Sequence, residues 1–438
     1  MRSTHSRRAT LGFTGVALFA FASPFVIPAC SSSSSSGPTT PGDDASMSDG
    51  STIDGSVDAS HDTSTADHSD ADAAPSVDGN MPDVDAATMD ADLDSASDAD
   101  DASDATTDAG LVHYVTGVTV STLAGSDVAG MQDGTGAGAQ LDNPTGISLD
   151  PHGNLLVADY DSSLVRLVTP AGVVTTIASA TNFADPFATV VASDGTFYVQ
   201  TDANSTPAKN ATSGTIWRVV PLGDGGVATP TVVAAGFGRP RSLAPTTGGN
   251  LLVVDRTTDV ADTLVVATGV SSLLAGMSGV SGYTNATGAL AEFASPVGVA
   301  PMPDGSFVVS DTGNNRIRRI DSGGVVTTFA GNGTAAFVDG ACASASFNGP
   351  RAIAVDAAGN VYVSDNGNSV IRRIDVGCTV ETLAGDGTAG FNNGAGNIAE
   401  FYGQEGVAVT TDGKIVYVAD GNSGDGSAHN RIRAIAVP

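Results

Sequence analysis

The stretch FNGPRAIAVDAAGNVYVSDNGNSVIRRIDVGCTVETLAG, residues 347–385, contains the pattern that indicates the fold of this chain. Its apolar residues alternate in four short runs, at 353–355, 361–363, 371–374 and 380–383. Clusters of Gly, Asn and Asp separate these runs. Apolar alternation over a few residues, bounded by turn-forming residues, is typical of β-strands. The stretch therefore predicts four short strands joined by tight turns, which form a β-meander.

Further copies of this pattern occur on both sides of the stretch. They begin at Leu141, Phe183, Phe237, Phe293 and Phe401. Five of the six copies carry a proline at the same place, and the last carries Gln404 there. The prolines are Pro144, Pro186, Pro240, Pro296 and Pro350. Four strands repeated at an interval of about 50 residues are typical of a β-propeller.

The two ends of the repeat region complement each other. Complete copies finish with a strand of the type VxTLAG, whereas the last copy stops after residues 432–435 without one. A matching segment, residues 118–125, precedes the first copy instead. Pairing of these two segments completes the last blade and removes an exposed sheet edge. We therefore expect residues 111–438 to form an all-β, six-bladed β-propeller that is closed by its N-terminal strand.

The repeated residues resemble the NHL repeat family. The pattern PxGIAVDxxGNVYVSDxxNxxIRRI is clearest at 350–374 and 296–320, and the resemblance extends over residues 118–438. The second copy departs from it at residues 199–202, and the third copy has DTLV at residues 262–265 in place of IRRI. Proteins with this repeat include bacterial surface proteins, RNA-binding regulators and a few enzymes. The resemblance thus implies the fold, and function has to be argued from a site.

Two charged positions recur in most copies. Asp159, Asp255, Asp311, Asp365 and Asp420 end the second strand. Arg166, Arg218, Arg318, Arg372 and Arg433 lie on the third strand. Because a residue that repeats in successive blades most simply supports the blade, we expect either Asp–Arg pairs or Asp side chains that accept hydrogen bonds from turn amides. The single tryptophan, Trp217, is expected to pack between blades.

Residues 1–30 have the features of an export signal. Two arginines precede an apolar run, which Pro24 and Pro28 interrupt too early for a membrane-spanning helix. The segment ending in Cys30 resembles a bacterial lipobox, and this resemblance implies a lipid on the Cys30 thiol; the alternative is an ordinary cleaved signal. Residues 6–11 also resemble the twin-arginine export pattern. We expect a protein anchored by lipid to the bacterial cell envelope, at the outer membrane, facing the periplasm or the surface.

Residues 31–110 form a segment of low complexity. They contain 20 Asp and no Lys or Arg, out of a net charge of −30 for the chain. With few apolar residues, such a segment does not bury enough surface to offset the entropy of ordering. We expect a disordered tether that divalent cations such as calcium screen loosely. The acidic balance argues against nucleic acid as a partner, and we expect a monomer.

Candidate binding residues lie where the copies differ. The position after each module proline starts the innermost strand, near one mouth of the central channel, and holds Thr145, Phe187, Arg241, Val297, Arg351 and Glu405. Arg239 lies close to it. Arginines grip carboxylates in a bidentate manner, so Phe187, Arg239, Arg241, Arg351 and Glu405 predict a site for an anionic or zwitterionic ligand. The alternative is a solvated rim in which Glu405 pairs with an Arg.

The sequence predicts neither a catalytic set nor a metal site. No two of the six His have the spacing of metal ligands, and there is no GxSxG motif. Cys342 and Cys378 suggest a disulfide in an exported protein. Their pairing stays open, because Cys342 lies in a connection between blades and Cys378 opens a fourth strand.

Two functions follow as expectations. The first is a non-enzymatic binding or scaffold module that uses the propeller to bind a protein, peptide or glycan. The alternative is a channel-centred hydrolase or lyase, similar to lactonases or amidating lyases, which uses a divalent ion together with Glu405.

Overall fold

The computed structural model describes residues 112–438, apart from 193, 204–213, 223–225, 423–425 and 427–428. The expected export signal, the lipidation site at Cys30 and the tether at 31–110 lie outside the described residues. In the described part of the chain, no helix has the length and apolar character that a membrane crossing requires.

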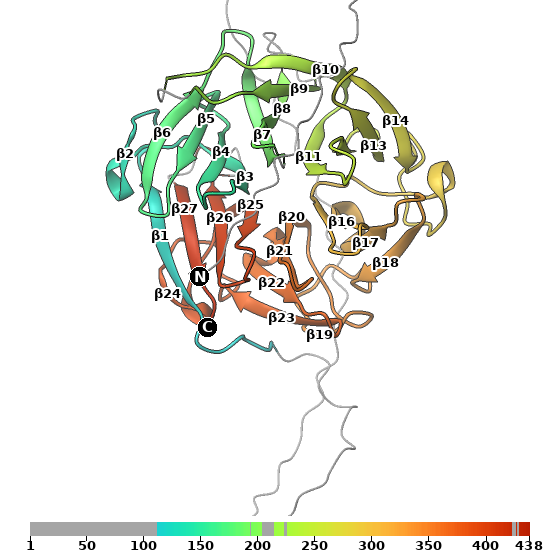
Figure 1. Cartoon of the computed structure of the whole chain (residues 1–438). Helices are drawn as coiled ribbons and strands as arrows, with labels where there is room; N and C mark the ends of the chain where they lie inside the picture. The colour runs from blue at the N-terminus through green and yellow to red at the C-terminus, as the bar shows by residue number, and fades with distance from the viewer. Residues whose placement is uncertain (1–111, 193, 204–213, 223–225, 423–425, 427–428) are drawn as a thin grey trace, which may run out of the picture. The chain divides into compact units, whose positions relative to one another are not determined.

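The described chain forms six antiparallel sheets arranged around a central axis, which are the blades of a propeller (Figure 1). Blade 1 contains β3 (Pro144–Leu149), β4 (Leu155–Asp159), β5 (Leu164–Val168) and β6 (Val173–Ala178). Blade 2 contains β7 (Ala184–Val191), β8 (Phe197–Ala203), β9 (Gly214–Val219) and β10 (Thr231–Phe237). Blade 3 contains β11 (Pro240–Pro245), β12 (Leu251–Asp255), β13 (Val260–Val265) and β14 (Val270–Ala275).

The remaining blades follow the same order, from the innermost strand outward. Blade 4 contains β15 (Val299–Pro301), β16 (Phe307–Asp311), β17 (Arg316–Ile320) and β18 (Val326–Ala330). Blade 5 contains β20 (Pro350–Val355), β21 (Val361–Asp365), β22 (Val370–Ile374) and β23 (Thr379–Ala384). Blade 6 contains β25 (Gly403–Val409), β26 (Ile415–Gly421), β27 (Asn430–Ala436) and β1 (Thr119–Ser126). The expectation of an all-β, six-bladed propeller is confirmed.

The N-terminal strand closes the ring as predicted. Strand β1 pairs antiparallel with β27, from Thr119 opposite Ala436 to Ser126 opposite Asn430. The residues before β1 extend the closure to blade 5, because Val115 N donates to Thr382 O and Thr382 N donates to His113 O, both at 3.0 Å. Residues 113–126 therefore bind two neighbouring blades and cover the edge that β27 leaves open.

The connections between blades add short outer strands to three of the sheets. Strand β2 (Gly134–Thr135) pairs with β6, β19 (Gly340–Ala341) with β23, and β24 (Gly394–Ala395) with β1. The described 3-10 helices are η1 (Gly136–Gly138), η2 (Gly288–Leu290), η3 (Thr312–Asn314), η4 (Asn366–Asn368) and η5 (Gly396–Ile398). These connections thus extend the blades.

The hydrophobic core lies between neighbouring blades. The residue that opens each copy is an apolar anchor with at most 1% exposure in five blades: Leu141, Phe183, Phe293, Phe347 and Phe401. Phe401, for example, packs with Ile371 and Leu383 of blade 5 and Val418 of blade 6. Burying a side chain of this size contributes roughly 1.5–3 kcal/mol. Trp217 is 1% exposed and packs against Leu156 and Val165 of blade 1, which confirms its predicted place between blades.

The predicted Asp–Arg pairs form in four of the described blades. The pairs are Asp159–Arg166, Asp311–Arg318, Asp365–Arg372 and Asp420–Arg433, with distances of 2.7–2.8 Å and all four arginines 0% exposed. We call Arg166, Arg318, Arg372 and Arg433 the blade arginines. The other guanidinium nitrogen of each reaches the preceding connection, at Asp133, Asn285, Asp339 and Asn393 respectively.

Blades 2 and 3 depart from this pattern, and the prediction for Arg218 was wrong. The register places Trp217 opposite Val199, where Arg372 stands opposite Val363 in blade 5. Trp217 Nε1 donates to Thr201 Oγ1 at 2.8 Å, and Arg218 is exposed instead. In blade 3 Asp262 takes the same position, opposite Val253. Without an arginine partner, Asp255 accepts hydrogen bonds from the backbone N–H groups of Thr257 and Thr258, at 3.0 and 3.3 Å.

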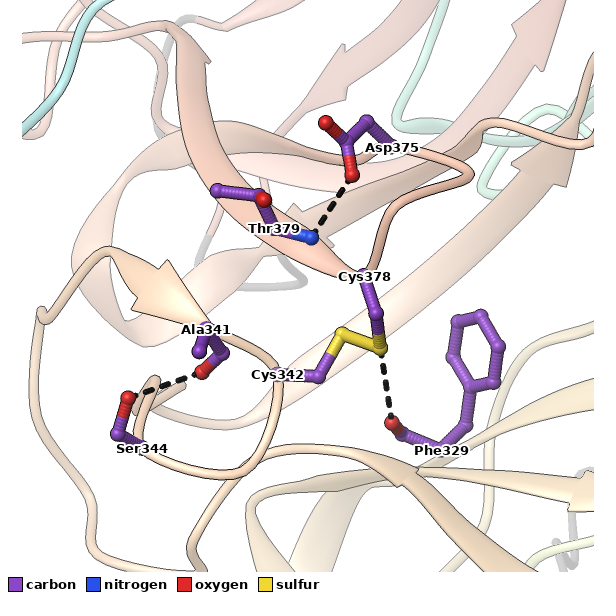
Figure 2. The surroundings of a disulfide bond; sticks show 7 residues. All are labelled: Phe329, Ala341, Cys342, Ser344, Asp375, Cys378 and Thr379. Atoms are coloured by element: carbon purple, nitrogen blue, oxygen red, sulfur yellow. Dashed lines mark hydrogen bonds between the residues drawn. A yellow bond between two sulfur atoms is a disulfide. The ribbon is translucent and has the colours of Figure 1, made fainter. Parts of the chain in front are cut away.

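A disulfide joins Cys342 to Cys378 on the outer edge of blade 5 (Figure 2). The Cα atoms are 5.3 Å apart. The two residues meet because β19 pairs with the start of β23, with Ala341 opposite Thr379. Cys342 N also donates to Cys378 O at 2.9 Å. A connection that is distant in sequence is thereby fixed to the last strand of the blade.

Candidate functional site

The predicted site residues come together at one end of the central axis. Phe187, Arg239, Arg241, Arg351 and Glu405 all line a cavity of about 320 Å³, which we call the mouth pocket. The same cavity is lined by Thr145 and Val297, which also follow module prolines, and by residues outside the predicted positions: Asn143, Tyr160, Asp161 and Arg256.

A repeated backbone irregularity directs these side chains toward the axis. In blade 3 Pro240 pairs with Asp255 and Ser242 pairs with Val254, so that Arg241 is left as the extra residue of a β-bulge. Equivalent register shifts follow Pro186 and Gln404, at Phe187 and Glu405. A bulge interrupts the alternation of a strand and turns its extra residue in a new direction. The scaffold therefore presents the most variable position of the repeat at the channel mouth.

Close approach of neighbouring inner strands explains the glycine that follows Glu405. A Cβ atom at Gly406 would lie 2.1 Å from Thr145 O in blade 1. Glycine is the residue that permits such an approach between backbones. The inner strands of blades 6 and 1 are therefore close together at this level of the channel.

Arg241 is the most buried charged group in the pocket. It is 5% exposed, its Nη2 lies 3.0 Å from Asp202 Oδ2, and its guanidinium lies 3.8 Å from the centroid of the Phe187 ring. Its Nε and Nη1 atoms are buried without a hydrogen-bond partner among the described residues. Burial lowers the pKa of Arg241 to about 10; Asp202 opposes this shift and Arg239 adds to it. The side chain is still a cation at neutral pH, with N–H groups available to an acceptor.

A second arginine of the pocket is already paired. Arg351 forms an ion pair with Glu405, which is 8% exposed. Burial, together with the positive charges of Arg256 and Arg241, lowers the pKa of Arg351 to about 10. The alternative expected from the sequence, in which Glu405 pairs with an arginine, therefore describes this part of the pocket. This ion pair does not involve Arg241 or Arg256.

Asp202 supplies the negative charge behind the pocket. It is 0% exposed and receives hydrogen bonds from Arg239 Nη2 at 2.9 Å and from Gln200 Nε2 at 3.1 Å, in addition to its ion pair with Arg241. One buried carboxylate thus holds two arginines in position. Charged hydrogen bonds of this kind fix geometry as well as contributing energy.

Arg256 completes the positively charged side of the pocket. Burial lowers its pKa, as does the charge of Arg239, while Asp202 acts in the opposite direction. Together with Arg239, Arg241 and Arg351 it faces three carboxylates, those of Asp161, Asp202 and Glu405. The pocket therefore carries an excess of positive charge in a chain whose net charge is −30.

Arg256, Tyr160 and Asp202 were not among the predicted site residues, although they share one position in the repeat. Arg256 and Tyr160 follow the last residue of a second strand, at Asp255 and Asp159, and Asp202 holds the equivalent place within β8, after Thr201. This position varies between copies as much as the position after the module proline does. Two variable positions per blade, brought together only by the pairing of the first and second strands, build the mouth.

The described part of the chain contains no cluster of potential metal ligands. No group of three or more His, Cys, Asp or Glu side chains is arranged there to hold a metal ion. What the pocket offers instead is a set of guanidinium donors around a cavity.

Comparison with known proteins identifies the repeat and the fold. The NHL repeat model matches residues 293–320 and 347–374, so the propeller contains NHL repeats. A chloroplast protein of Arabidopsis thaliana, Protein SUPPRESSOR OF QUENCHING 1, is 37% identical over 82 residues, which are 18% of this chain and 8% of that protein. The chain thus covers a small part of this curated relative.

Solved structures from Bacteroides share the architecture. A protein of unknown function from Bacteroides thetaiotaomicron superposes with a TM-score of 0.58 at 22% identity, over 73% of this chain and 76% of that one. Auxiliary nutrient binding proteins from Bacteroides thetaiotaomicron and Bacteroides ovatus superpose with TM-scores of 0.57 and 0.56, each at 18% identity and with the same coverage. At these identities the similarity concerns the fold.

Proposed function

We propose that this protein is an extracytoplasmic binding module, whose propeller binds a peptide, protein or glycan through a carboxylate group in the mouth pocket. The observation that carries the proposal is the state of Arg241, whose Nε and Nη1 atoms are buried without a partner among the described residues. A buried donor without an acceptor costs about 1–3 kcal/mol, which an anionic ligand would recover on binding.

The charge of the pocket favours a carboxylate over a neutral ligand. The charges of Arg256 and Arg241 lower the pKa of Arg351, and the charge of Arg256 also lowers the pKa of Arg241. An anion between them relieves this repulsion. Arginine also matches the planar geometry of a carboxylate, which lysine does not. A binding role agrees with the description of two structural relatives as auxiliary nutrient binding proteins.

The N-terminal region supplies the cellular context of the proposal. A lipid on Cys30 would hold the protein on the bacterial envelope, and residues 31–110 would separate the propeller from the membrane. Replacement of Cys30 by Ala tests the anchor, with the expected result that the protein moves from the membrane fraction to the soluble fraction. Retention of the variant in the membrane fraction contradicts the anchor and leaves the binding proposal intact.

Calorimetric titration of the full-length protein tests the pocket. The probe is acetyl-Ala-Ala with a free carboxylate, compared with the same peptide as its C-terminal amide. We expect the acid to bind and the amide not to bind, and we expect affinity to fall as salt concentration rises. Arg256→Gln should weaken binding of the acid by about tenfold or more, since it removes a charged donor.

The matched control for Arg256→Gln is Arg319→Gln. Arg319 is a partly exposed arginine of blade 4 that pairs with Asp304, outside the mouth pocket. We expect this variant to bind the acid as the unmodified protein does. Equal binding of the acid and the amide, or equal loss in both variants, shows that the pocket does not select a carboxylate.

A further inference from the structure

A second cavity lies along the axis, next to the mouth pocket. This axial channel has a volume of about 300 Å³ and is lined by the inner strands of all six blades. Four residues line both cavities: Phe187, Arg241, Val297 and Glu405. Arg241, with its unpartnered Nε and Nη1 atoms, therefore lies at the boundary between the pocket and the channel.

The chemical character of the wall changes at this boundary. Among the residues that line the axial channel, Arg241 and Glu405 are the only charged ones, and both belong to the boundary. Below them the lining residues are uncharged, and the partly exposed aliphatic side chains among them include Leu149, Val355 and Val409. Hydroxyl groups such as that of Ser242 are used in contacts between blades, as in its hydrogen bond with Val299.

This change of character restricts the part of a ligand that can enter the channel. A second charge there would lose its hydration and find no charged partner in the described wall, which is strongly unfavourable. An apolar group would gain about 25 cal/mol for each Å² of surface removed from water. A ligand held by its carboxylate at Arg241 therefore places an uncharged, apolar group in the channel.

We propose that the mouth pocket and the axial channel together bind a monocarboxylate with an apolar chain, the carboxylate at Arg241 and Arg256 and the chain along the axis. This inference rests on the proposed function and narrows it. The chemistry is shared by two sources, a free aliphatic acid and a peptide C-terminus whose last side chain is apolar. In both, the single charge is next to the group that enters the channel.

The experiment is a calorimetric comparison of butyrate, hexanoate, octanoate and adipate on the full-length protein. We expect affinity to rise about fourfold for each methylene group, until the chain fills the channel. Adipate is as long as hexanoate but carries a second carboxylate, and we expect it to bind at least tenfold more weakly. Comparison of acetyl-Gly-Leu with acetyl-Gly-Gly measures the same effect for a peptide. The ligand class that gains more affinity from its apolar group, peptide or aliphatic acid, is the preferred source.

A channel variant provides an independent measurement. Ala352→Phe enlarges a partly exposed side chain in the lining of the axial channel without removing a charge from the mouth. We expect octanoate to lose its advantage over butyrate in this variant, while butyrate binding stays close to that of the unmodified protein. If the variant does not fold, the comparison of hexanoate with adipate still decides whether the channel excludes a second carboxylate.

The outcomes separate this inference from the proposed function. Equal affinities for butyrate, octanoate and adipate, all reduced by Arg256→Gln, overturn the channel and leave the mouth pocket as a carboxylate site. Failure of every acid and of acetyl-Ala-Ala to bind overturns both proposals. A rise in affinity with chain length, together with exclusion of adipate, supports both.

Discussion

Blade 5 and blade 3 are built from the same repeat but carry their arginines in different places. In blade 5, Arg372 lies on the third strand, is 0% exposed, and is held between Asp365 and Asp339. In blade 3, Asp262 occupies the corresponding position, and arginines instead appear at 239, 241 and 256, all in the lining of the mouth pocket.

The comparison separates two uses of the same residue type. Arg372 has both guanidinium ends satisfied by carboxylates within hydrogen-bond distance. Arg241 has one carboxylate partner and two nitrogen atoms without any among the described residues. A charge that the fold itself satisfies stabilises the blade, whereas a charge that the fold leaves incomplete is available to a ligand. Blade 3 differs from the repeat consensus in the way expected of a blade that carries a binding site.

The largest effect is expected when the blade arginine of blade 5 is removed. Arg372→Met leaves the carboxylates of Asp365 and Asp339, which are 0% and 2% exposed, without their cation. Loss of one partner from a buried ion pair costs about 3–5 kcal/mol, because the remaining charge stays buried. The free energy of unfolding in urea measures this loss.

Arg318→Met in blade 4 is the matched comparison for Arg372→Met. Arg318 also has a buried partner, Asp311, but its second acceptor is the exposed, neutral amide of Asn285. We therefore expect a smaller loss of stability than for Arg372→Met. Equal effects of the two substitutions would show that Asp339 does not contribute to the difference.

The disulfide of blade 5 is expected to have the next largest effect. Cys342→Ala with Cys378→Ala opens a loop that spans 36 positions in sequence. The chain-entropy model assigns about 3–4 kcal/mol to a loop of this length. The free energy of unfolding should fall by this order, and carboxylate binding at the mouth pocket should stay unchanged. A change in affinity would show that blade 5 transmits its stability to the mouth.

The smallest effect is expected at Asp262 in blade 3. Burial raises the pKa of Asp262 above its ordinary value of 3.8, and the charge of Asp255 adds to the shift. The folded state therefore favours the protonated form, so the favourable contribution exists at low pH and is lost as pH rises through the raised pKa. Asp262→Asn should increase stability by less than about 1 kcal/mol at neutral pH.

The pH dependence of unfolding checks the sign of this effect. The advantage of Asp262→Asn should vanish below pH 3.8, where Asp262 is protonated in both the folded and the unfolded state. Urea unfolding at pH 3.5 and pH 7 provides the comparison. A destabilising effect at pH 7 would mean that the charge of Asp262 has a favourable partner, and that blade 3 retains a structural ion pair of its own.

Much of the architecture could be derived from the sequence because a propeller is built from local repeats. The alternating apolar residues of each copy define its strands, and the absence of a final strand after residues 432–435, with its counterpart at 118–125, predicts the closure. The recurrence of Asp365 and Arg372 predicts their pairing, since they lie on adjacent strands seven residues apart. The error at Arg218 arose because Trp217 replaces the arginine one residue earlier, a shift that only the strand register shows.

Only the tertiary structure decided how the mouth is assembled. Arg241, Arg256, Arg351 and Asp202 come from three different blades, and no spacing in the sequence states that they meet. The bulge after the module proline and the pairing of the first two strands set the direction of each side chain. The sequence alone determines each blade because its contacts are local in the chain. The charge balance at the axis depends on all six blades at once, and so it follows from ring closure rather than from any one repeat.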